Sequence, residues 1–113
     1  MTVLELSKLL SLTPLAGEPA LSREVTGCYA GDLLSWVMSR VQSGDAWLTV
    51  MGNVNAIAVA VLSDAACIIL VDGASLDEEA KIRADEKHIA VLRSSESSYA
   101  LCVKIAALLN SHV

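Results

Sequence analysis

The stretch Ala46-Trp47-Leu48-Thr49-Val50-Met51 is short and almost continuously apolar, which predicts a buried strand. After a turn at Gly52-Asn53-Val54-Asn55, the residues from Ala56 to Leu62 predict a helix without a polar face. A second apolar run, Ala66-Cys67-Ile68-Ile69-Leu70-Val71, predicts another strand that ends at Asp72-Gly73. Strand, turn, helix and strand within about thirty residues is the size of a βαβ unit, and such a unit implies a parallel sheet.

The length and composition are those of a single domain with a core of small aliphatic side chains. The chain has 113 residues, and we treat residues 1–113 as one α/β domain. Hydrophobic residues make up 54% of the chain, aromatic residues only 4%, and phenylalanine is absent. Such a core favours thin strands and closely packed helices. The high apolar fraction also predicts that part of the surface is covered by assembly.

The charge pattern excludes several function classes. A net charge of −5 without any run of lysine or arginine argues against nucleic-acid binding, which requires a cationic face. No unbroken apolar run approaches the roughly 18 residues of a membrane-spanning helix, so we expect no membrane insertion. Residues Met1 to Glu5 lack the cationic start of a signal peptide, and we therefore expect a cytoplasmic protein.

The cysteine and histidine residues do not indicate a metal centre. Cys28, Cys67 and Cys102 are far apart in the sequence, and His88 and His112 each stand alone. No spacing typical of zinc or cluster ligands results, so we expect neither a metal nor a cofactor. We interpret the three cysteines as small hydrophobic residues.

Helices and strands alternate on both sides of the central stretch. The elements predicted before it are a helix from the capping box Thr2–Glu5 to about Leu10, a strand and turn over Leu12–Pro19, a strand over Arg23–Cys28, and a helix over Leu33–Gln42 capped by Asp32. The elements predicted after it are a charged helix opened by a second capping box at Ser75–Glu78, a strand over Ile89–Leu92, and a helix from Tyr99 to about Asn110. We therefore predict a three-layer α/β/α sandwich with a mostly parallel or mixed central sheet of about five short strands. Right-handed crossovers would place helices on both faces of this sheet.

Polar residues follow the predicted parallel strands at their carboxyl ends, where ligands bind in open sheets. The candidate ligand-binding residues are Gly52, Asn53, Asn55, Asp72, Gly73, Arg93, Ser94 and Ser95. Asn53 or Asn55 would cap a helix whose free amides favour an anion, and Arg93 could bind a phosphate or carboxylate with two hydrogen bonds. The alternative for each single residue is an ordinary helix cap or a solvated loop residue.

The helix that begins at Ala56 is apolar on nearly every side, whereas a helix on a sheet needs only one apolar stripe. We therefore predict a homodimer in which the same helix meets itself across a two-fold axis. The candidate interface residues are Ala56, Val59, Ala60 and Ser63. The alternative is that the helices Leu33–Gln42 and Tyr99–Asn110 close over this surface, with Trp36 or Tyr99 as lids.

Short motifs along nearly the whole chain resemble a known family. They are Leu15-Ala16-Gly17 with Leu21-Ser22-Arg23-Glu24-Val25-Thr26-Gly27, Gly31-Asp32-Leu33-Leu34, Trp47-Leu48-Thr49, Asn55-Ala56-Ile57-Ala58-Val59-Ala60, and Ile68-Ile69-Leu70-Val71-Asp72-Gly73. With these motifs the chain resembles a stand-alone DRTGG-domain protein, and it is similar also to the non-catalytic N-terminal domain of HPr kinase/phosphorylase.

The family is named after a Gly-Asp-Arg turn and a Thr-Gly-Gly turn. The corresponding turns here are Gly52-Asn53-Val54 and Val71-Asp72-Gly73, so the glycines are kept while the acid and the arginine of the first turn are absent. The role of those charged residues does not carry over to this chain. In the family these domains accompany phosphotransacetylases and CBS-containing pyrophosphatases, so the resemblance implies a regulatory and dimerising module.

Two function classes follow. The first is a non-catalytic module that dimerises, senses a small anionic metabolite or nucleotide at the strand ends, and acts on an unidentified protein partner. The second is a small enzyme of phosphoryl or acyl-phosphate chemistry that uses the same pocket. The expected pocket offers one carboxylate, Asp72, and serines without a partnering histidine, and no glycine-rich phosphate loop is present. We therefore favour the module and assign no catalytic residue.

Overall fold

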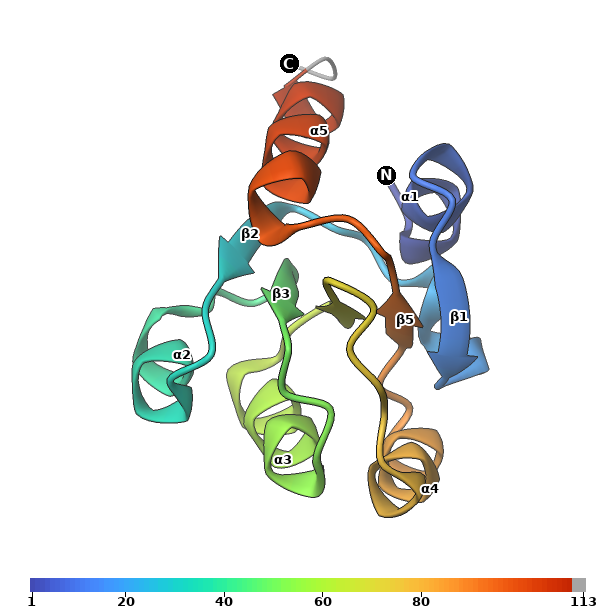
Figure 1. The fold of residues 1–113 in the computed structure, drawn as a ribbon, viewed down its shortest axis with the longest axis vertical. Helices are drawn as coiled ribbons and strands as arrows, with labels where there is room; N and C mark the ends of the chain where they lie inside the picture. Colours follow the sequence, from blue (N-terminus) through green and yellow to red (C-terminus); the bar gives the residue numbers. More distant parts are fainter. Residues whose placement is uncertain (111–113) are drawn as a thin grey trace.

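The computed structural model describes residues 1–110, in which a five-stranded sheet lies between two layers of helices (Figure 1). The strands are β1 (Thr13–Ala16), β2 (Gly27–Ala30), β3 (Asp45–Thr49), β4 (Cys67–Leu70) and β5 (Val91–Arg93), in the spatial order β1-β5-β4-β3-β2. Strands β2 to β5 are parallel, and β1 runs antiparallel to β5 with Thr13 opposite Arg93. The predicted α/β sandwich with a mixed sheet is confirmed.

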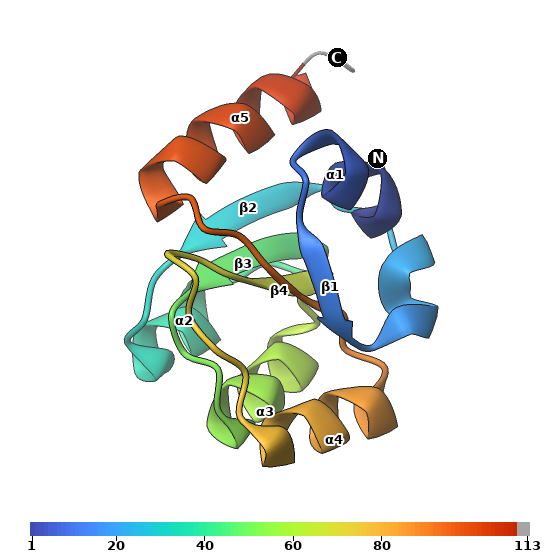
Figure 2. The same ribbon diagram turned by 45° about the vertical axis from the view of Figure 1, so that its right-hand side comes forward.

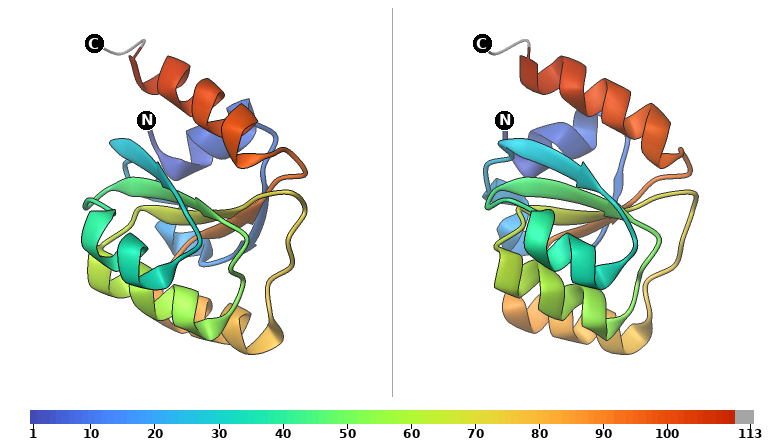
Figure 3. Two further views of the ribbon diagram at one scale, coloured as in Figure 1. Left: turned by 60° about the vertical axis from the view of Figure 1, so that its left-hand side comes forward. Right: turned by 90° about the vertical axis from the view of Figure 1, so that its left-hand side faces the viewer.

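The helices divide unequally between the two faces of the sheet. They are α1 (Val3–Leu9), α2 (Leu34–Arg40), α3 (Val54–Ser63), α4 (Glu78–Lys87) and α5 (Ser98–Asn110). Figure 3 shows α2, α3 and α4 together on one face and α1 with α5 on the other. The parallel strands follow one another in a single direction across the sheet, so crossovers of one hand all fall on the same face. This corrects the expectation that crossovers supply both layers.

Two predicted segments differ from the structure near the N-terminal layer. The turn after β1, expected to exclude a helix, forms a short 3₁₀-helix, η1 (Glu18–Ser22), with Pro19 in its first turn (Figure 2). Residues 23–25 were expected in a strand of the sheet. They bond instead to the start of the chain, because Val3 donates its N–H to Arg23 O at 2.8 Å and Val25 donates its N–H to Met1 O at 2.8 Å. Strand β2 therefore begins only at Gly27.

The helix cap predicted for α1 is confirmed, whereas those predicted for α2 and α4 are wrong. Thr2 and Glu5 form the expected capping box of α1. Helix α4 begins after Asp77 without a side-chain cap bond, so no second capping box forms. The Asp32 carboxylate does not cap α2 but accepts hydrogen bonds from Thr49 Oγ1 at 2.7 Å and Val50 N at 2.9 Å. It thereby ties the end of β2 to the end of β3.

The core consists of one apolar cluster on each face of the sheet. Alternate residues of a strand serve opposite clusters, as the pairs Leu48 and Ile69 on one face and Trp47 and Ile68 on the other illustrate. The α1/α5 cluster is centred on Leu6, Leu101 and the sheet, while α2, α3 and α4 cover the second cluster. None of the helices within residues 1–110 is long and apolar enough to cross a membrane.

Candidate functional site

The sheet has one topological switch point at the carboxyl ends of its parallel strands. The chain leaves β4 toward α4 on one face and leaves β5 toward α5 on the other (Figure 1). Open α/β sheets bind ligands outside the strand ends at such a point. A hollow of about 310 Å³ lies there, and its lining consists of Leu10, Ser11, Thr13, Gly73, Arg93, Ser94, Ser95 and Glu96.

Three segments that are distant in sequence meet around this hollow. They are the end of α1 with the start of β1, the loop after β4, and the loop after β5. The two loops are joined by main-chain hydrogen bonds, from Gly73 N to Ser94 O and from Asp72 N to Glu96 O, both at 2.8 Å. The walls of the hollow are therefore held by backbone rather than by flexible side chains.

The arginine of the hollow has no acceptor among residues 1–110. Arg93 is the last residue of β5 and is half-buried between its neighbours Thr13 and Leu70 on the adjoining strands. Among residues 1–110, its guanidinium makes no hydrogen bond and no ion pair. A guanidinium carries five N–H donors in a planar fork that matches the oxygens of a carboxylate or phosphate. The group is thus available to an anion that enters the hollow.

The carboxylate of the hollow is already paired. Lys104, in the second turn of α5, donates from Nζ to Glu96 Oε1 at 2.6 Å. The backbone of Glu96 is also fixed, since its N–H donates to Ser94 Oγ at 3.0 Å. Glu96 therefore does not neutralise Arg93, although both side chains line the same hollow.

The predicted ligand-binding residues separate into two groups. The structure brings Gly73, Arg93, Ser94 and Ser95 together in the hollow. Asp72 immediately precedes Gly73 and adopts a positive φ of 53° at the turn. These residues share one edge of the sheet because they follow adjacent parallel strands, as the topology argument expects.

The residues of the first predicted turn have other positions. Asn53 Oδ1 accepts a hydrogen bond from Ala56 N at 3.0 Å and so caps α3. Asn55 lines a separate groove of about 410 Å³ between α3 and α4. Gly52 packs against the loop before α4, where a Cβ would lie 2.0 Å from Ser75 O. These contacts give each of the three a structural role away from the hollow.

The predicted dimer residues lie mostly inside the subunit, which corrects the surface expected from the sequence. Ala56, Val59 and Ala60 are at most 7% exposed and belong to the core cluster beneath the sheet. Ser63 is partly buried and donates its hydroxyl to Val59 O at 2.8 Å. The side of α3 that faces solvent carries Leu62, which is 72% exposed, and Val61, which is 40% exposed.

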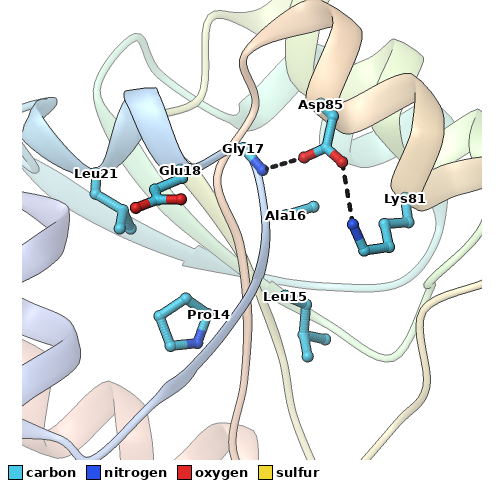
Figure 4. Close-up of a pocket in the computed structure, with 8 residues that line it drawn as sticks. All are labelled: Pro14, Leu15, Ala16, Gly17, Glu18, Leu21, Lys81 and Asp85. Atoms are coloured by element: carbon cyan, nitrogen blue, oxygen red, sulfur yellow. Dashed lines mark hydrogen bonds and ion pairs between the residues drawn. The ribbon is translucent and has the colours of Figure 1, made fainter.

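A second hollow of about 370 Å³ lies beside the edge strand β1, between η1 and α4 (Figure 4). Gly17 donates its N–H to Asp85 Oδ1 at 2.8 Å, and Lys81 Nζ lies 3.1 Å from Asp85 Oδ2. The Gly17 N–H, followed by Lys81, lowers the pKa of Asp85 below its usual range. Asp85 and Lys81 satisfy each other and form a structural tie between β1 and α4. Among the described residues, the remaining charged residue of the lining is Glu18, so this hollow offers no unpaired cation to an anion.

The cysteines are poor candidates for nucleophiles. Burial raises the pKa of the Cys67 thiol to about 12. Burial, and then the neighbouring Cys102, also raises the pKa of Cys28. Thiolates are the reactive form of cysteine, so these two thiols are held in their unreactive form at neutral pH. Within residues 1–110, no three histidine, cysteine, aspartate or glutamate side chains are grouped so that they could hold a metal ion.

Comparison with known proteins identifies a structural neighbour. No family model and no curated sequence matches the chain. Among solved structures, it is similar to the CBS and DRTGG domains of the regulatory region of Clostridium perfringens pyrophosphatase, in complex with the activator diadenosine tetraphosphate. The TM-score is 0.63 at 13% identity, with 85% of this chain covered and 42% of the other chain spanned. The two proteins share a fold, and the neighbour is a regulatory rather than a catalytic region.

Sequence reasoning missed Leu10, Ser11, Thr13 and Glu96 as lining residues. The first three reach the hollow only because β1 pairs with β5, and a short strand carries no sequence signal for its partner. Glu96, for which the sequence predicted no contact, lies in the loop between β5 and α5. Helix α5 starts shortly after Glu96 and contains Lys104. The short separation of the two residues in the sequence was the available signal for their ion pair.

Proposed function

We propose that this chain is a regulatory domain of the DRTGG type that binds a small anionic ligand in the hollow at the carboxyl ends of β4 and β5. The observation that carries the proposal is Arg93, a half-buried residue at the topological switch point whose guanidinium has no acceptor among residues 1–110. The fold shared with a regulatory region supports the regulatory role. The sequence motifs that resemble the DRTGG family point in the same direction.

The size of the hollow favours a compact ligand. Its volume of about 310 Å³ is at the lower end of the roughly 300–1,000 Å³ typical of small-molecule sites. A mononucleotide, an acyl phosphate or a smaller metabolite suits this volume better than a dinucleotide polyphosphate. Backbone groups and the hydroxyls of Ser11, Thr13 and Ser95 add neutral donors around the single cation.

Binding by the purified chain tests this function directly. Inorganic phosphate, acetyl phosphate and adenosine monophosphate would be titrated by calorimetry and by thermal shift against the wild type, Arg93→Gln and the surface control Arg83→Gln. A charge-assisted hydrogen bond contributes about 1.5–3 kcal/mol, so we expect Arg93→Gln to weaken binding at least tenfold. Equal affinity of the Arg93→Gln variant would remove the site, and turnover of acetyl phosphate, followed by ³¹P NMR, would favour an enzyme instead.

We infer further that the domain assembles as a homodimer through the outer face of α3. That face is apolar, with exposed Leu62 and Val61, and the small Ala58 lets another helix approach closely. Helix α5 lies on the opposite side of the sheet (Figure 3), so Tyr99 does not cover α3. Trp36 is 55% exposed and stacks with Arg40 on α2, with the guanidinium carbon 4.0 Å from the ring centroid, so it leaves this face open as well.

The association state of matched variants tests the dimer. Leu62→Arg places a charge on the proposed interface, whereas Leu9→Arg places one at a similarly exposed position on α1, on the other face of the molecule. Sedimentation equilibrium at micromolar concentration should give a dimer for the wild type and Leu9→Arg, and a folded monomer for Leu62→Arg. A monomeric wild type contradicts the interface.

A further inference from the structure

The hollow at the carboxyl ends of β4 and β5 is lined by charges of both signs. Arg93 supplies one positive charge and Glu96 one negative charge to its lining. Lys104 binds Glu96 but is not itself a lining residue, so an anion in the cavity contacts the carboxylate more closely than the ammonium. Asp72 precedes the lining residue Gly73 in the sequence but does not itself line the hollow.

We propose that this hollow selects anions with a single negative charge, and that Glu96 is the residue that sets this specificity. The inference rests on the proposed function, because it assumes that Arg93 binds the anion. It ranks ligands within that function: carboxylates and phosphodiesters bind more tightly than the dianionic mononucleotides and acyl phosphates. The guanidinium fork can engage two oxygens of a carboxylate or of a phosphodiester, and either group is then neutralised. The lining within residues 1–110 contains no further cation for the second charge of a phosphate monoester, and the carboxylate of Glu96 repels this charge.

Glu96 is held where it is, so it does not simply move away from a bound dianion. Its backbone N–H donates to Ser94 Oγ at 3.0 Å, and its carbonyl accepts from Asp72 N at 2.8 Å. The ion pair with Lys104, at 2.6 Å, holds the carboxylate in this position. A ligand that turned the Glu96 side chain away would have to break its ion pair with Lys104.

The size of the effect follows from the Coulomb interaction of one charge pair within a small, partly solvated cavity. For neighbouring unit charges, and with an effective dielectric constant between that of a protein surface and that of water, such a repulsion changes affinity by a factor on the order of ten to one hundred. We therefore expect that removal of the Glu96 charge shifts the ratio of dianion to monoanion affinity by about tenfold.

Two small phosphates that differ in charge test the preference for a single negative charge. Dimethyl phosphate carries one charge, and methyl phosphate carries two at pH 8, because the second pKa of a phosphate monoester is about 6. Both would be titrated into the ¹⁵N-labelled full chain, with the amide signals of Gly73, Ser94 and Ser95 as the readout. Acetate forms a third arm, and its affinity relative to dimethyl phosphate tells a carboxylate site from a phosphodiester site.

We expect wild-type protein to bind dimethyl phosphate more tightly than methyl phosphate. In Glu96→Gln the ratio should shift toward methyl phosphate by about tenfold, whereas the control Glu86→Gln, on the outside of α4, should keep the wild-type ratio. A wild type that prefers methyl phosphate, or a ratio unchanged in a folded Glu96→Gln, overturns the specificity and leaves anion binding intact. If neither phosphate nor acetate moves these signals in the wild type, the binding function itself is refuted. The wild-type preference needs no variant and decides the matter should Glu96→Gln fail to fold.

Discussion

Gly17 offers a test of how closely the edge strand is fitted to the rest of the fold. It has a φ of 69°, and a Cβ built on it would lie 1.9 Å from Ile89 O. An alanine there would face both a left-handed backbone, at about 1–2 kcal/mol, and an overpacked contact, at about 1–3 kcal/mol. We expect Gly17→Ala to lower the free energy of unfolding by about 3 kcal/mol, a large part of the total stability of a domain of this size.

Two other glycines separate these contributions. Gly73 has nearly the same φ of 68°, but a Cβ on it meets no atom within 4 Å. Gly52 lacks a positive φ, yet its Cβ would lie 2.0 Å from Ser75 O. Gly73→Ala should therefore cost only about 1 kcal/mol of backbone strain, and Gly52→Ala should cost about 1–3 kcal/mol of steric conflict.

Urea unfolding followed by circular dichroism measures all three variants against the wild type. The expected order of destabilisation is Gly17→Ala first, then Gly52→Ala, then Gly73→Ala. Equal losses for Gly17→Ala and Gly73→Ala would show that the close approach to Ile89 has no energetic weight, and the reasoning would be refuted.

Three further predictions concern stability and reactivity. Replacing Asn53 by alanine removes the cap bond to Ala56 and should cost about 1 kcal/mol in urea unfolding while phosphate affinity stays unchanged; a lost affinity would return Asn53 to the site. The depressed pKa of Asp85 means that its carboxylate stabilises the fold above pH ~4, the unfolded value, and stops doing so as the pH falls through the lower folded value. The stability difference between wild type and Asp85→Asn, below about 1 kcal/mol for so exposed a group, should therefore vanish in acid, and a difference that persists there contradicts the assignment. Cys67, with its raised pKa of about 12, should react with a thiol reagent at pH 8 only as fast as the chain unfolds, so rapid labelling in native buffer would contradict its burial.

The βαβ unit between residues 46 and 73 was predictable because its strands are apolar on both faces and its turns are marked by polar residues. The part of the site that follows β4 and β5 was predictable for the same reason, since parallel topology alone places Gly73 and Arg93 at one edge. The contributions of Ser11 and Thr13 were not predictable, because they depend on which strand β1 chooses as its neighbour.

Helix α3 shows a second limit of sequence patterns. Its residues are apolar on almost every side, so the pattern contains no information about which side faces the sheet. The interface predicted around Val59 and Ala60 was therefore placed on the buried side, and the exposed side carries Leu62 instead. Asp32 shows a third limit. It is a residue type well suited to cap a helix, but its carboxylate instead links the ends of two strands by accepting hydrogen bonds from Thr49 and Val50.

The antiparallel pairing of β1 with β5 has a consequence for the order in which the protein can be assembled on the ribosome. Residues 13 and 93 are partners, and β1 has no other strand beside it. Strands β2, β3 and β4 and their helices can form as the chain emerges. Strand β1, which precedes them, stays unpaired until β5 has been synthesised. A contact so distant along the chain has a high entropic cost of closure, which slows folding. Until then Pro14, which has no N–H to donate, disfavours the pairing of β1 with strands of other nascent chains.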